Sequence, residues 1–145
     1  MSRVDNQARI TEINSKLSRL GTDYYNATIR LNSAKTKQET LTTAQYQLNK
    51  LLENYYAFPS DYGSLGSSIL DSQFRGSLRE EVRVHLERIE AHLQTFKSRH
   101  EDRLKIIDDE LTATENDVTS LTRQISTINT TVSLLESERR ILLLS

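Results

Sequence analysis

The chain has 145 residues, enough for one domain, and with one proline, four glycines and 27% charged residues it is typical of long helices rather than of a sheet. A formal net charge of −1 argues against binding to nucleic acid, which requires a concentrated basic surface. Because there is no cysteine, a disulfide framework, thiolate chemistry and cysteine-based metal sites are excluded.

The first half of the chain carries one unbroken heptad stripe. From Ile10 to Tyr55, apolar residues recur in alternating steps of three and four, so with Ile10 at heptad position a the stripe occupies positions a and d. This spacing predicts a helix over about residues 5–57 whose seam faces a partner helix. Ser2, followed three residues later by Asp5, resembles a capping box at the start of this helix.

The middle of this first seam is weak. Ala27, Ala34, Gln38 and Gln45 occupy seam positions where a self-sufficient coiled coil favours leucine or isoleucine. Two interpretations remain open. Small residues allow two helices to approach closely, or a third helix from another chain completes this layer.

The residues most able to interrupt a helix lie together near the middle of the chain. Pro59, Gly63, Gly66 and Gly76 all fall in this segment, and proline and glycine are the residues that cost most inside a helix. We therefore predict a bend over about residues 58–77, with Gly76 offering a left-handed conformation.

A second heptad stripe follows the bend. Ser77 and Glu80 form a capping-box pattern, and apolar residues continue from Leu78 to Leu142. This pattern predicts a second helix over about residues 77–143, and the alternative is a continuous helix from about Ser68 that includes Gly76. The expected fold is thus all-α, a single domain over residues 1–145 built as an antiparallel helical hairpin of two long coiled-coil-like helices.

The second stripe contains one irregularity. Phe96, His100 and Leu104 are separated by two consecutive steps of four, which is a four-residue insertion into the heptad pattern. Such a stutter locally unwinds a supercoil. In an antiparallel hairpin, it would lie at the height of the weak layer of the first helix.

With these boundaries, the second helix is longer than the first by about 14 residues, or roughly 21 Å. The excess, Thr131–Ser145, would project past the first helix, and its apolar end Ile141–Leu144 either tucks back onto the hairpin or forms a docking patch. We predict a partner interface on the stripe that leads into this overhang. Its residues are Leu121, Ile125, Ile128, Val132 and Leu135.

The sequence offers little for catalysis or cofactor binding. His85 and His92 share a helix face but lack the acidic neighbours of a metal motif, so no metal or other cofactor is expected. Gly63 and Gly66 have no phosphate-binding lysine beside them. Two long helices also form no enclosed cleft for a substrate, which predicts a protein that is not an enzyme.

The segment Phe74-Arg75-Gly76 lies between two long amphipathic helices, and here the chain resembles the WXG family of small helical hairpins of bacterial type VII secretion. Its length and long arms are similar to those of the larger WXG-like partners of LXG toxins. The resemblance implies that Phe74 and Gly76 form the bend motif. It also implies that the chain binds the helical N-terminal domain of a toxin as a targeting factor or chaperone, with a second small WXG-like protein as a further partner.

The chain departs from this family in two ways. Phe74 stands where the family has tryptophan, and no tyrosine or phenylalanine has an acidic residue four positions later, as the family's export signal requires. The alternative is a self-associating coiled-coil scaffold or tether, and a homo-oligomer is compatible with both interpretations. The N-terminus carries no secretory signal, and no stretch reaches the ~18–20 apolar residues of a membrane span. We therefore expect a cytoplasmic protein, or one exported with its partner.

Overall fold

The computed structural model describes residues 2–71 and 76–145, with side chains for 2–57, 76 and 79–145. Two helices, α1 (Arg3–Asp71) and α2 (Ser77–Leu144), account for nearly all of this part of the chain. The predicted all-α helical hairpin is confirmed. Each helix contributes to two compact units. The terminal unit comprises Met1–Glu39 and Thr112–Ser145, and the middle unit comprises Thr40–Leu111.

The start of α1 has the predicted cap. The Ser2 hydroxyl accepts a hydrogen bond from the Asp5 amide at 3.2 Å, and the Asp5 carboxylate accepts one from the Ser2 amide at 3.0 Å. This reciprocal pair satisfies backbone donors that have no partner within the helix. The hydrogen bond with Ser2 also lowers the pKa of Asp5. An aspartate therefore performs the role that glutamate usually has in a capping box.

The predicted end of the first helix is wrong. We expected it near residue 57, but α1 continues through Pro59 to Asp71, so the bend is shorter than residues 58–77. A proline removes one hydrogen bond and costs about 3 kcal/mol, and each glycine costs about 1 kcal/mol. Such costs weaken a helix without dictating where it ends. Phe74, the aromatic residue of the predicted bend motif, lies outside the described residues.

Gly76 immediately precedes α2 and has a φ of 69°, as its predicted left-handed role requires. Its carbonyl accepts the first hydrogen bond of the helix, from the Glu80 amide at 3.3 Å. The carboxylate of Glu80 pairs with Arg83, which also donates to Glu87 at 2.6 Å. The turn into α2 therefore depends on a conformation that residues with a Cβ rarely adopt.

We predict that Gly76→Val destabilises the hairpin by about 1–2 kcal/mol, the usual cost of a left-handed conformation for a residue with a Cβ. Apart from the two chain neighbours, no atom of the described residues lies within 4 Å of the position that a Cβ would occupy, so the expected cost is that of the backbone conformation. Urea denaturation monitored by circular dichroism measures it. Gly76→Asn is the control and should lose less, because asparagine tolerates this region. Equal losses for both variants would contradict this account.

The two helices are almost equal in length, with 69 residues in α1 and 68 in α2. The predicted overhang at Thr131–Ser145 is therefore wrong. Side chains near the C-terminus instead lie beside the start of α1, where Arg9 binds Glu138 and Asn14 accepts a hydrogen bond from Arg139. The error follows directly from the misplaced end of α1, because the helix is longer than its heptad stripe.

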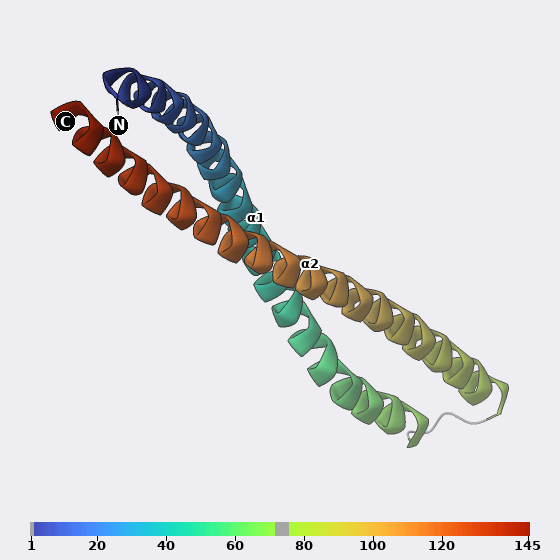
Figure 1. The fold of residues 1–145 in the computed structure, drawn as a ribbon. Helices are drawn as coiled ribbons and strands as arrows, with labels where there is room; N and C mark the ends of the chain where they lie inside the picture. Colours follow the sequence, from blue (N-terminus) through green and yellow to red (C-terminus); the bar gives the residue numbers. More distant parts are fainter. Residues whose placement is uncertain (1, 72–75) are drawn as a thin grey trace. The chain divides into compact units, whose positions relative to one another are not determined.

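The terminal unit is an antiparallel pair of helical segments, with both chain termini at the same end (Figure 1). The predicted seam is confirmed here: from Ile10 to Gln38, every a and d residue except Tyr24 is buried or half-buried. The α2 segment contributes its own stripe to the same core. The most buried apolar residues of this unit are Ile13, Ala27, Leu121 and Ile128.

The middle unit also buries the predicted stripe on α1, from Leu41 to Tyr55, with Leu52 only 2% exposed. On α2 the stutter changes which residues are covered. His100 is buried, whereas Ile89 and Phe96 are largely exposed. Four residues rotate a helix by about 400°, so consecutive steps of four move the stripe sideways around the helix.

Threonines along both helices hydrogen-bond back to the helix that carries them. In each case the hydroxyl donates to the backbone carbonyl four residues earlier, at 2.7–3.3 Å. This arrangement satisfies the hydroxyl without a water molecule or a neighbouring side chain. The threonines are Thr11, Thr22, Thr28, Thr36, Thr95, Thr119, Thr122, Thr127, Thr130 and Thr131.

Candidate interaction surface

The structure brings the predicted interface residues onto one face of α2, but that face belongs to the core of the terminal unit. Leu121 and Ile128 are each only 7% exposed. Ile125, Val132 and Leu135 are half-buried. The residues of this stripe therefore pack mainly inside the hairpin. Only the partly exposed residues leave surface that another chain could reach without opening the pair.

The end of α2 does not tuck onto the hairpin as one of our two interpretations expected. Of its four consecutive apolar residues, Leu142 is half-buried, whereas Ile141, Leu143 and Leu144 are 66–85% exposed. The helix continues to Leu144, so neighbouring side chains point in different directions around it. The alternative interpretation, a docking patch, stays a prediction.

A cross-helix cluster of charges fixes the pairing in the terminal unit. Arg9 donates two hydrogen bonds to Glu138, at 2.7 and 3.0 Å, and a third to Glu12 at 2.7 Å. Hydrogen bonds from Lys16 and Arg9 lower the pKa of Glu12 to about 2. Because these groups are largely solvated, they define the register more than they stabilise the fold.

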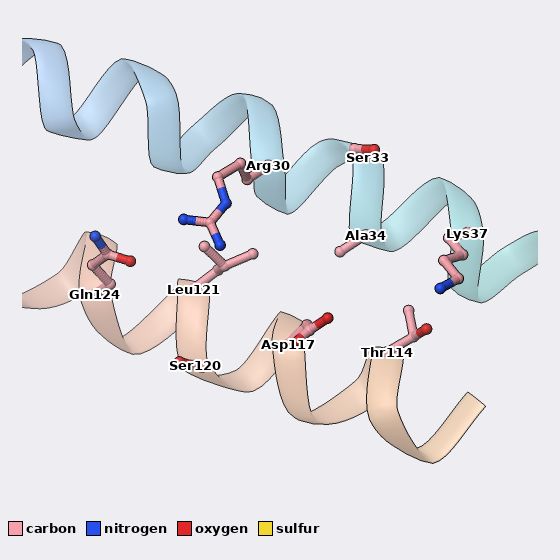
Figure 2. A pocket seen from close by; sticks show the side chains of 9 residues that line it. All are labelled: Arg30, Ser33, Ala34, Lys37, Thr114, Asp117, Ser120, Leu121 and Gln124. Atoms are coloured by element: carbon pink, nitrogen blue, oxygen red, sulfur yellow. The ribbon is translucent and has the colours of Figure 1, made fainter. Parts of the chain in front are cut away.

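The weak layer of the first seam contributes to a groove of about 330 Å³ in the terminal unit. Figure 2 shows Ala34 and Leu121 pointing toward the opposing helix, with Arg30 and Lys37 reaching across from α1. Thr114, which also lines the groove, is 2% exposed. This groove does not decide between close approach of the two helices and a third helix from another chain, so both interpretations of the weak layer stay predictions. The groove that remains is polar.

One edge of the middle unit is closed by polar contacts between the helices. Gln45 donates to Asp108 at 2.7 Å, and the Tyr56 hydroxyl donates to Glu101 at 2.8 Å. The hydrogen bond to Glu101 raises the pKa of Tyr56. In the heptad frame Gln45 and Tyr56 occupy a and e positions, which lie on the same side of the seam. We call this side the closed edge.

The other edge of the middle unit is open and mainly apolar. A groove of about 500 Å³ lies here, which we call the middle groove, and a smaller hollow of about 300 Å³ adjoins it at Leu51. Leu51 and Ile106 remain 40% and 63% exposed. The residues that line the middle groove are Ala44, Gln47, Leu48, Leu51, His100, Arg103, Ile106 and Ile107.

His100 is the most unusual residue of this groove. It is only 7% exposed and packs edge-on against Phe96, with ring centroids 4.2 Å apart, and near Tyr55 at 5.9 Å. Both ring nitrogens are buried without a hydrogen-bond partner in the described part of the structure. Buried polar atoms are normally paired, so this imidazole occupies a site that suits an apolar side chain better.

Among the described residues, no three histidine or acidic side chains gather as a metal ion would require. None of the described helical segments combines the length and apolar character needed to cross a membrane. Comparison with protein-family models, curated proteins and solved structures found no match. The features of the chain that bear on its function are therefore the surfaces described above and the segment Phe74-Arg75-Gly76.

The sequence reasoning missed Leu51 and Ile106. Both lie outside the a and d positions on which that reasoning depended, but each stands beside a seam residue in an apolar doublet, Leu51-Leu52 and Ile106-Ile107. Adjacent residues on a helix point about 100° apart, so one seam buries only one member fully. Such doublets were the signal that could have identified the exposed surface.

Proposed function

We propose that this chain is a non-enzymatic helical partner protein that binds the helical N-terminal domain of a type VII-secreted, LXG-type toxin as a targeting factor or chaperone. The observation that carries the proposal is the set of large apolar side chains left exposed beside the seam. Leu51, Ile106 and Leu134 are 40–67% exposed, each next to a more buried apolar neighbour. Leu51 and Ile106 line one apolar groove, and contiguous exposed apolar surface of that kind commonly marks a site of protein interaction.

Helices from a partner are well suited to cover this surface. A partner helix laid against either unit would bury the exposed apolar side chains of that unit in a bundle of three or more helices, as coiled-coil assemblies do. The resemblance at Phe74 and Gly76 to the WXG family implies that the partner is the N-terminal domain of a toxin. The same exposed residues would also serve self-association, which is the alternative function as a coiled-coil scaffold or tether.

Co-expression with the products of neighbouring genes tests the proposal. We expect a tagged chain to co-purify with the N-terminal domain of a toxin in a complex of fixed stoichiometry, measured by light scattering. Leu134→Asp should weaken that complex at least about fivefold, because aspartate would replace an apolar contact with a desolvated carboxylate, at a cost of more than about 1 kcal/mol. Thr122→Asp, at an exposed polar position of the same helix, should leave it unchanged.

The contrary result is equally clear. If no partner co-purifies and the chain alone forms a discrete homo-oligomer, the scaffold function replaces the proposed one. The helix content of each variant is measured by circular dichroism, because only a variant that retains wild-type helix content reports on binding rather than on unfolding.

A further inference from the structure

The two edges of the middle unit differ in a way that indicates what can cover each of them. At the closed edge, polar side chains of α1 and α2 already satisfy one another. At the open edge, Leu51 and Ile106 flank the middle groove and are substantially exposed. An added helix would gain apolar burial at the open edge, whereas at the closed edge it would have to break existing hydrogen bonds.

The charges along the open edge are also one-sided. The α1 residues that face it occupy c and g heptad positions and are uncharged: Thr40, Ala44, Gln47, Leu51 and Asn54. On α2, Arg103 lines the groove and Arg99 lies one turn before it on the same face. Glu110, one turn beyond Ile106, already has an interaction partner in the structure. Arg103 is therefore the one Lys, Arg, Asp or Glu residue among those that line the groove, and α1 contributes no charge to this edge.

We propose that the middle groove is the docking site for an amphipathic helix of a protein partner, with an apolar stripe that covers Leu51 and Ile106 and flanking carboxylates that pair with Arg99 and Arg103. This inference rests on the proposed function and names the chemistry of the partner. Arginine is suited to this role because its guanidinium group binds carboxylates in a bidentate geometry.

The groove has a second feature that suits a bound partner. His100 lines it, is more than nine-tenths buried, and has two ring nitrogens without partners among the described residues. Because buried polar atoms are normally hydrogen-bonded, a partner that reaches the groove can supply the pairing that this imidazole lacks among the described residues. A carboxylate or hydroxyl that reaches the groove would supply an acceptor for the imidazole N–H.

Two synthetic peptides test the proposal directly. Both are about three heptads long and share one leucine stripe, but one has glutamate and the other lysine at the flanking positions. In fluorescence anisotropy at low salt, we expect the full chain to bind the glutamate peptide at least about tenfold more tightly than the lysine peptide. That preference should shrink as salt is added, because exposed charge pairs are screened.

Variants of the chain identify the site. Arg103→Glu should abolish or reverse the preference between the peptides. The double variant Leu51→Asp and Ile106→Asp should lose binding to both peptides at least about tenfold. Tyr46→Asp is the matched control, because Tyr46 is 59% exposed but occupies a b position toward the closed edge. It should bind like the wild type.

Several results would overturn the groove proposal. The first is that neither peptide binds, and the second is that the wild-type chain binds both peptides with equal affinity. The third is that Tyr46→Asp loses as much peptide affinity as the double variant of Leu51 and Ile106. A dimer of the chain that disappears with Ile106→Asp would make a second copy the occupant. None of these results decides the outcome of the co-expression experiment. A toxin domain that still co-purifies with the chain would support the proposed function with a binding site other than this groove.

Discussion

Replacing Ile128 with aspartate is expected to destabilise the terminal unit strongly. Ile128 is 7% exposed and lies in the core with Ile13 and Leu121. An unpaired carboxylate at this position would lose the apolar contacts and bury a charge, a combined cost of at least about 4 kcal/mol. Since a domain of this size has about 5–15 kcal/mol of stability, this is a large part of the total. Thermal denaturation followed by circular dichroism measures the loss.

Leu134→Asp provides the matched control on the same helix. Leu134 is 67% exposed, so its replacement should change the free energy of unfolding by no more than about 0.5 kcal/mol. The comparison also decides which variants can be used in binding experiments. If Ile128→Asp retained wild-type stability, the core of the terminal unit would not be as described.

His100→Leu is expected to stabilise the middle unit. The imidazole is buried with both nitrogens unpartnered, and each such group costs about 1–3 kcal/mol. Leucine removes that cost and has a similar volume. The ring contacts with Phe96 and Tyr55 would be lost, at about 0.5–1.5 kcal/mol. The balance favours the variant by about 2 kcal/mol, which corresponds to a rise in melting temperature of roughly 4–8 °C.

His92→Leu is the control for this prediction. His92 is on the same helix but exposed, so the substitution should leave the melting temperature nearly unchanged. A loss of stability in His100→Leu would show that the imidazole has a partner in solution, such as an ordered water. A matching gain in His92→Leu would show that the effect comes from helix propensity rather than from the buried nitrogens.

The fold could be predicted because one periodic signal dominates the chain. The 3–4 spacing from Ile10 onward identifies the residues that two antiparallel helices bury, and the Ser2–Asp5 cap marks where the first helix begins. The end of that helix could not be predicted from the same signal. The seam stops at Tyr55, whereas the helix continues to Asp71, since hydrogen bonding along a helix does not require a buried stripe.

The candidate surface could be predicted only in part. Heptad spacing identifies residues that pack together, and it therefore selected Leu121 and Ile128, which the hairpin itself buries. The exposed residues Leu51 and Ile106 carry no periodic signal of their own. Their position at the open edge depends on which side of the seam Gln45 and Tyr56 close with hydrogen bonds. That choice is made by pairs of side chains 45 and 63 residues apart in sequence.

The threonines that hydrogen-bond to their own helices change the hydrogen-bonding groups that the protein surface offers to water. Each hydroxyl, as in Thr22 or Thr122, donates its proton to a carbonyl of the preceding turn, so toward the solvent it acts as a hydrogen-bond acceptor. These positions therefore offer the hydration shell fewer hydrogen-bond donors than the composition suggests. A molecule that displaces this water would find hydroxyl oxygens for its own donors, with methyl groups beside them, but few partners for its acceptors.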